Sequence, residues 1–172
     1  GVLVVGFGNA TRLLNVIVDH DKTYEATIRL GQRTTTDDAD GETVSTRPVP
    51  AMSREALQAV VDARFTGTIE QVPNTYSAIK INGQRAYDLA RDGQEVRLKA
   101  RPVTIHEFAV FDARPVRVMT ATGEQSGESA EGHASEDGES RGDSVPILDA
   151  DVRVTCSAGT YIRALARDLG EA

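Results

Sequence analysis

The chain has 172 residues, 40% of them hydrophobic, which suits one folded domain with its own core. No run of eighteen apolar residues and no secretory signal is visible, so the sequence predicts no membrane segment. The single cysteine, Cys156, excludes an internal disulfide framework and suits a cytoplasmic protein. We expect it to be a small buried residue on a strand.

The net charge of −7 argues at first against a nucleic-acid partner. However, segment 122–144 holds seven acidic residues and one arginine, a net −6, and no apolar residue larger than alanine. We expect a disordered acidic insertion between two strands, because such a segment cannot bury enough surface to order itself. The rest of the chain is nearly neutral, so acidity does not exclude RNA binding.

The first half of the chain predicts four elements in order. The apolar residues 2–5 indicate a short buried strand, and residues 9–19 indicate a helix that is capped near Asn9, with a buried face formed by Leu13, Leu14 and Ile17. From Tyr24 the side chains alternate strictly, which predicts a half-buried strand ending at Gly31. Residues 53–67 predict an amphipathic helix with Ser53 as N-cap and a buried stripe formed by Ala56, Leu57, Val60 and Val61.

The second half alternates between strands and helices. Residues 76–84 predict a strand that runs into an Asn82–Gly83 turn, and residues 85–93 a short helix. Further strands are expected at 95–99, at 101–111 with a bulge between Ile105 and Phe108, and at 147–157. Residues 160–170 form the last predicted helix. The sequence therefore predicts an α+β domain, residues 1–172, with a mixed, mostly antiparallel sheet flanked by helices.

The acidic stretch TTTDDADG, residues 34–41, fails as a metal loop. With Gly41 at the sixth position of a calcium loop, Thr36 stands where the first carboxylate belongs and Arg47 where the last glutamate belongs. The three histidines are far apart in the sequence, so we expect no metal site and a turn whose acids cap backbone groups. GFGNAT lacks the third glycine of a dinucleotide loop, and no GxSxG elbow occurs.

Two polar residues stand out because each lies at the start of a clearly predicted strand or helix. Tyr24 opens a strand on its apolar face, where a tyrosine is either a core residue with its hydroxyl at the rim or part of a site. Arg163 begins a helix just after a strand, where it can hold a carboxylate or phosphate. Arg163 and Arg167 can equally form a solvated basic edge, and spacing alone does not decide.

Five segments in register resemble the TruB family of tRNA pseudouridine synthases: GVL…GNATRLL, DKTYEATIRLGQRTTTDDADG, QVPNTYSAIKINGQRAYDLARDG, ARPVTI and CSAGTYIRALARDLG. The resemblance implies an isomerase that converts the uridine at position 55, in the tRNA T loop, to pseudouridine. It implies base flipping, covalent aspartate catalysis, a monomer that binds the tRNA T arm, and no cofactor, metal or membrane.

The resemblance also assigns roles to residues. Tyr24 would stack on the flipped base and assist proton removal from C5, and Arg163 would pair with and orient the catalytic aspartate. Tyr161 would line the pocket. The remaining implied substrate contacts are those of Lys22 and Lys80 with the RNA backbone or pocket wall, and that of Asp38 near the pocket.

The family nucleophile is an aspartate in a G-T-L-D-P-x-A-x-G motif, whose last glycine resembles Gly1. We therefore expect a fragment cut at both ends, inactive alone, with its nucleophile upstream and not replaced by Asp37, Asp38 or Asp40. Two alternatives stay open: a noncatalytic tRNA-binding or folding module, and an acidic cytosolic interaction domain. Tyr24, Arg163 and SAIKINGQRAY weigh against the second of these.

Overall fold

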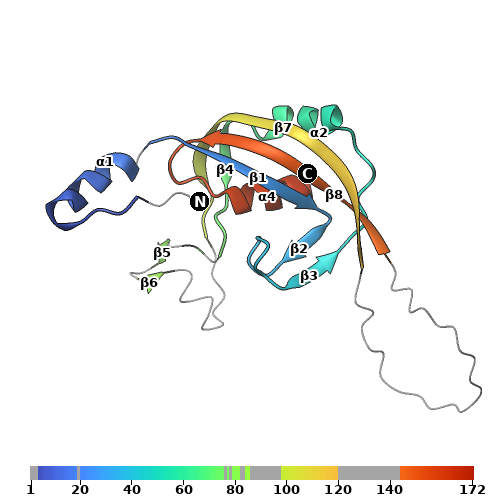
Figure 1. Ribbon diagram of the computed structural model, residues 1–172, viewed down its shortest axis with the longest axis horizontal. Helices are drawn as coiled ribbons and strands as arrows, with labels where there is room; N and C mark the ends of the chain where they lie inside the picture. Colours follow the sequence, from blue (N-terminus) through green and yellow to red (C-terminus); the bar gives the residue numbers. More distant parts are fainter. Residues whose placement is uncertain are drawn as a thin grey trace, which may run out of the picture.

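The computed structural model describes residues 4–18, 20–75, 77, 79–81, 84–85, 98–119 and 144–172. Its centre is an antiparallel sheet in the strand order β1-β8-β7-β4 (Figure 1). These strands are Lys22–Leu30, Ser144–Cys156, Arg101–Met119 and Gly67–Gln71. Two small antiparallel sheets join β2 (Gln32–Thr34) to β3 (Thr43–Thr46) and β5 (Lys80–Ile81) to β6 (Gln84–Arg85). The predicted α+β class is confirmed.

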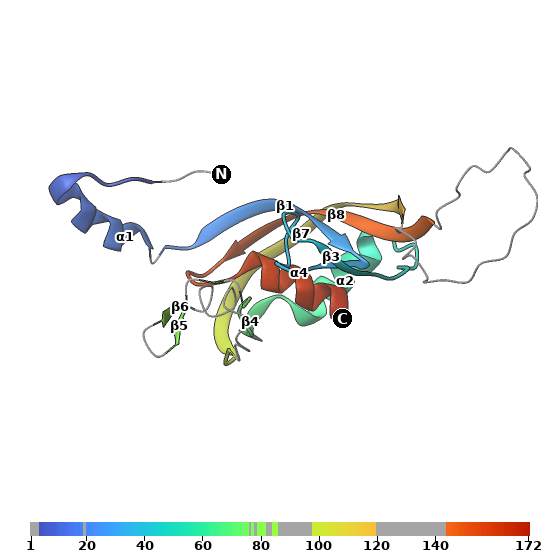
Figure 2. The ribbon, with the colours of Figure 1, turned by 90° about the horizontal axis from the view of Figure 1, so that it is seen from below.

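Helices α2 (Arg54–Arg64) and α4 (Ile162–Glu171) cover the same face of the large sheet (Figure 2). Both helices pack buried leucines against the sheet, and every second residue of strand β8 from Leu148 to Cys156 belongs to the same core. The core includes Leu57 and Val61 of α2, Leu165 and Leu169 of α4, and Leu148, Ala150, Val152, Val154 and Cys156 of β8. The opposite face is polar, so the sheet is half-buried, as the alternation in the sequence predicts.

Local signals in the sequence fix several boundaries correctly. The Ser53 hydroxyl accepts a hydrogen bond from the Ala56 amide at 3.2 Å and caps α2, although Ala56 itself is exposed. Gly31 ends β1 with a φ of +98°, in the left-handed region. A side chain there would meet the Arg47 carbonyl at 2.7 Å. The predicted bulge is confirmed by a register shift between Ile105 and Glu107, and a second shift follows at Val110/Asp112.

The N-terminal predictions are only partly correct. Val4 and Val5 are exposed and belong to no strand, and residues 2–3 lie outside the described ranges. The expected helix consists of a 3₁₀ segment, η1 (Gly8–Leu13), and a short α1 (Leu14–Val18), with Phe7 rather than Asn9 at the N-cap. This arm extends away from the sheet (Figures 1 and 2). Its predicted core residues Leu13 and Ile17 are therefore exposed, since no described apolar layer faces them.

Other predictions fall outside the described ranges or need correction. The Asn82–Gly83 turn, residues 86–93 of the helix predicted at 85–93 and residues 122–143 are outside. Arg85 was predicted to begin that helix but belongs to strand β6, and Ser144 is the first residue of β8. Leu98 and Lys99, the described end of the predicted strand 95–99, belong to no strand. Strand β4 was not predicted, because it begins at Gly67, the residue at which the predicted helix ends. Among the described helices, none has the length and apolarity needed to cross a membrane.

Candidate active site

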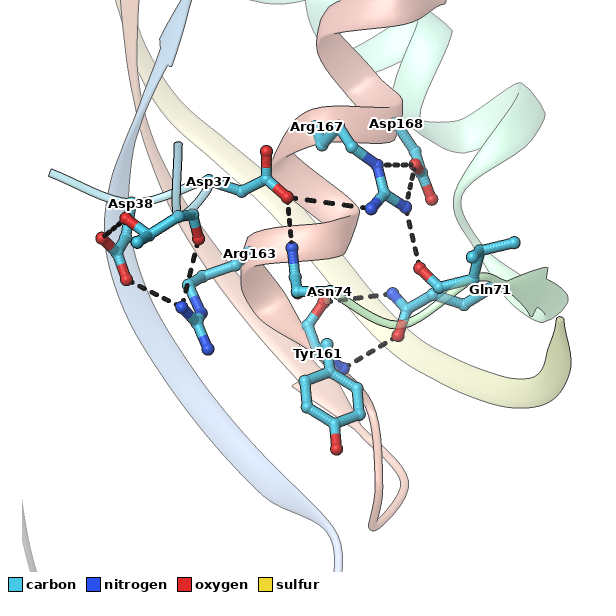
Figure 3. A network of polar contacts seen from close by, with 10 residues as sticks. Asp37, Asp38, Gln71, Asn74, Tyr161, Arg163, Arg167 and Asp168 are labelled. Carbon is cyan, nitrogen blue, oxygen red and sulfur yellow. Dashed lines mark hydrogen bonds and ion pairs between the residues drawn. The ribbon is translucent and has the colours of Figure 1, made fainter. Parts of the chain in front are cut away.

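Three segments that are distant in the sequence meet around the N-terminal end of α4 (Figure 3). They are the acidic turn after β2, the stretch that follows β4, and the first two turns of α4 itself. Each contributes polar side chains that contact one of the other two segments. The result is a continuous polar network beside the core, and it contains three of the residues that the sequence singles out: Asp38, Tyr161 and Arg163.

Arg163 is held directly by the acidic turn. Its Nη1 donates to Asp38 Oδ2 at 2.9 Å and to the Thr36 carbonyl at 3.1 Å. The Thr36 hydroxyl (2.5 Å), the Asp40 amide (3.2 Å) and Arg163 together hold the pKa of Asp38 below its usual value, with the Thr36 hydrogen bond as the largest cause. Asp38 is therefore ionised at neutral pH, and its predicted backbone-capping role is confirmed by the bond from Asp40.

The neighbouring Asp37 faces the second arginine of α4. Its Oδ2 accepts a hydrogen bond from Asn74 Nδ2 at 2.6 Å and lies 3.8 Å from Arg167 Nη1. Arg167 also donates to Asp168 Oδ1, at 2.8 and 2.9 Å, and to the Val72 carbonyl at 2.8 Å. Only 18% of the Arg167 side chain is exposed. The alternative of a solvated basic edge is therefore wrong for Arg167.

Tyr161 is fixed through its backbone by a buried glutamine. Gln71 is fully buried; its Nε2 donates to the Tyr161 carbonyl at 3.1 Å, and its Oε1 accepts from the Tyr161 amide at 2.9 Å. The Arg101 guanidinium lies 5.0 Å from the centroid of the Tyr161 ring and donates to the Gly159 carbonyl at 2.5 Å. The backbone of residues 159–161, which leads into α4, is thus held by Gln71 and Arg101.

Tyr24 and Lys22 lie on β1, the strand against which α4 packs. Tyr24 is 39% exposed, and burial, with a smaller contribution from Cys156, raises the pKa of its phenol above the usual value. Tyr24 is therefore a neutral phenol at physiological pH. Lys22 Nζ donates to the His20 carbonyl at 3.1 Å. Lys80 lies in β5, and its side chain is outside what the structure describes.

Several residues of this network were not predicted from the sequence. Gln71, Asn74 and Asp37 bind partners far along the chain, and no local periodicity reports such contacts. For Gln71 and Asn74, the only available signal was that polar residues lie on both sides of Pro73, directly after an amphipathic stretch. Within the described ranges, no group of three or more His, Cys, Asp or Glu side chains is arranged to hold a metal ion.

The sequence matches known proteins along most of its length. Residues 1–128 match the family described as "TruB family pseudouridylate synthase (N terminal domain)". The chain belongs to the TruB family. Its relatives include tRNA pseudouridine synthase B of Bifidobacterium longum, which is 53% identical over 195 residues covering 99% of this chain and 48% of that protein.

Two further TruB relatives agree with this assignment. The tRNA pseudouridine synthases B of an Arthrobacter species and of Thermobifida fusca are each 51% identical, over 100% and 99% of this chain. The alignments cover 47% and 50% of those two proteins. The chain thus spans about half the length of the curated TruB relatives it matches.

Proposed function

We propose that this chain is part of the catalytic domain of an RNA-modifying isomerase, which converts the uridine at position 55 in the T loop of tRNA to pseudouridine. Membership of the TruB family and relatives named tRNA pseudouridine synthase B support the reaction. The observation that carries the proposal is the fixed guanidinium of Arg163, held by Asp38 and the Thr36 carbonyl at the start of α4.

The reaction is an isomerisation that needs no oxidant or reductant. The bond between C1′ of the ribose and N1 of the base breaks, the uracil rotates, and a new bond joins C1′ to C5. The C5 proton is lost and N1 gains a proton, so atoms and electrons balance. A base inside a folded tRNA arm must first be flipped out, because its reacting atoms are otherwise covered by neighbours.

In this proposal Arg163 orients the nucleophilic aspartate. A guanidinium carries five N–H donors, so Arg163 can contact Asp38 and orient a second carboxylate at the same time. An adjacent cation also keeps that second carboxylate ionised, as a nucleophile must be. The aspartate would come from residues that precede Gly1 in an enzyme as long as the relatives, and this chain alone would then be inactive.

Tyr24 and Tyr161 would hold the flipped uracil. Tyrosine offers a flat stacking surface, and Tyr24 is 39% exposed. Since the pKa of Tyr24 is raised by burial, its phenol begins the reaction protonated. It can therefore stack and pass a proton, but it accepts the C5 proton only after its own has moved. Lys22, Lys80 and Asp38 would contact the RNA or the pocket wall.

The test is to express an enzyme as long as the relatives that contains this chain, and incubate it with tRNA transcript. Pseudouridine is measured by mass spectrometry after nuclease digestion, with a transcript carrying cytidine at position 55 as control. We expect conversion at that position only. Binding of tRNA without conversion would overturn the enzyme proposal and support the noncatalytic tRNA-binding module instead.

A further inference from the structure

Two arginines of α4 each face a different aspartate of the acidic turn after β2. Arg163 and Arg167 stand one helical turn apart on the same face of α4. Asp38 binds the first at 2.9 Å, and Asp37 faces the second at 3.8 Å (Figure 3). The proposed mechanism uses Arg163 and Asp38, whereas it gives no role to Asp37 and Arg167.

The backbone of Asp37 shows that its place in the turn is imposed by surrounding contacts. Its φ of 57° lies in the left-handed region, which costs free energy for a residue with a Cβ, though aspartate and asparagine tolerate it best. Such a conformation persists only where neighbouring groups hold it. Here the Asn74 amide binds the Asp37 carboxylate at 2.6 Å, and the Arg167 guanidinium lies beside it.

Arg167 is itself fixed by other partners than Asp37. Two of its nitrogens donate to Asp168 Oδ1, and Nη2 also donates to the Val72 carbonyl at 2.8 Å. The side chains of Asp37 and Arg167 are each only 18% exposed, whereas those of Asp38 and Arg163 are 33% and 34% exposed. The inner pair is therefore less exposed to water than the outer pair, although its 3.8 Å separation is longer than the 2.9 Å of the outer pair.

We propose that Asp37 and Arg167 are positioning residues, which fix the acidic turn against α4 and thereby set the direction of Arg163. Thr36 and Asp38 flank Asp37, so any rotation of its backbone moves both groups that hold Arg163 Nη1. A displacement of about 1 Å at an orienting group can lower a rate about a hundredfold. This inference rests on the proposed function, because only that reaction uses the direction of Arg163.

The test compares variants of the full-length enzyme by single-turnover pseudouridine formation, tRNA Kd and melting temperature. Asp37→Asn keeps a residue that tolerates the left-handed region but removes the charge that faces Arg167. We expect the single-turnover rate to fall about tenfold, with the tRNA Kd within about twofold. Arg167→Gln, a second variant that removes the other charge of the same pair, should give the same loss.

A matched control separates positioning from general stability. Asp149→Asn weakens another aspartate–arginine pair, with Arg29, on the far face of the sheet, where Asp149 Oδ1 lies 2.8 Å from Arg29 Nε. We expect this control to lower the melting temperature and leave the single-turnover rate of the folded enzyme unchanged. If Asp37→Asn and Arg167→Gln affect only the melting temperature, as the control does, the positioning role is overturned.

The decisive readout is the effect of Asp37→Asn in an Arg163→Lys background, followed over long incubations. If Asp37 acts through Arg163, the second substitution should change the remaining rate less than about twofold. An equal tenfold loss in both backgrounds would show that Asp37 acts independently, and would overturn the inference. Failure of the proposed function looks different, because the unsubstituted enzyme would then form no pseudouridine at all.

Discussion

The two faces of the molecule use the same arginine–carboxylate chemistry in different ways. On the open face of the sheet, Glu25 with Arg153 and Arg29 with Asp149 are direct cross-strand partners in the β1–β8 register. Their ion pairs reinforce neighbours that the backbone ladder already brings together. At the start of α4 the pairs instead join segments that no ladder connects, such as Asp38 with Arg163, which are 125 residues apart.

This difference predicts which contacts serve stability and which serve chemistry. A cross-strand pair on the open face joins residues whose positions the sheet ladder already fixes. A pair that locates a turn against a helix determines where functional groups point. Substitutions should therefore affect turnover on the α4 side and stability alone on the sheet side.

The largest expected effect is on Arg163. Arg163→Ala in the full-length enzyme should lower turnover about a thousandfold, because the proposed nucleophile loses the cation that orients it. The tRNA Kd should stay within about threefold, since Arg163 is proposed to act on the carboxylate rather than on the RNA backbone. Single-turnover assays and filter binding measure the two quantities. Equal losses in binding and turnover would contradict the orienting role.

The next effect concerns two glutamines that make matching contacts with backbone groups, one at the start of α4 and the other between α2 and β7. Gln71 bridges the amide and carbonyl of Tyr161, and Gln58 accepts from the Val110 amide at 2.7 Å and donates to the Phe108 carbonyl at 2.9 Å. Either glutamine changed to alanine should lower the free energy of unfolding by about 2–3 kcal/mol, because buried backbone groups lose their partners. Only Gln71→Ala should also lower turnover of the folded enzyme.

Urea denaturation and single-turnover rates in native buffer separate these two outcomes. The Gln58 variant serves as the control, because it removes the same type of contact at the β7 bulge and not at Tyr161. Equal loss of turnover in both variants would mean that activity follows overall stability, and that the contacts of Gln71 have no specific effect on the reaction.

A smaller effect is expected on the sheet face. The side chain of Asp149 is 9% exposed and binds Arg29 through both carboxylate oxygens, each at 2.8 Å. Asp149→Ala should lower the free energy of unfolding by about 1–2 kcal/mol, since water solvates the half-exposed Arg29 that is left behind. Urea denaturation measures this change. A loss of turnover in the folded variant would show that the sheet face also takes part in the reaction.

The smallest effect is a shift in the acid stability of the turn. The pKa of Asp38 is lowered from its usual 3.8, so its ionised form stabilises the fold above that pH, and this contribution is lost as pH falls through the lowered pKa. The stability difference between the unsubstituted protein and Asp38→Asn should therefore be constant from neutral pH to about pH 5 and shrink below the usual value.

Thr36→Val removes the largest cause of that shift, so it should raise the pKa of Asp38 toward 3.8. An NMR titration of the Asp38 carboxyl carbon measures the change directly. If the pKa stays as low in Thr36→Val, then Arg163 rather than the Thr36 hydroxyl holds Asp38 ionised, and the turn is organised from the helix side.

The sequence by itself determined the family and the regular elements that have a clear period. The alternation from Tyr24 to Leu30 and over 147–157 gave β1 and most of β8, and the apolar stripes gave α2 and α4. These signals are readable because the side-chain period depends only on the local backbone. The same periodicity misled at Leu13 and Ile17, since a stripe shows which face is apolar but not whether anything covers it.

Only the tertiary structure decided which partners the polar residues contact. The sequence proposed Arg163 as a site residue but did not show that Asp38 holds it, nor that Asp37 and Asn74 stand beside Arg167. Such partners come from chain segments with no fixed spacing, brought together when the helices pack on the sheet. Hydrogen bonds and ion pairs act over a few ångströms in space, whatever the separation in sequence, and so their pairing appears only once the chain is folded.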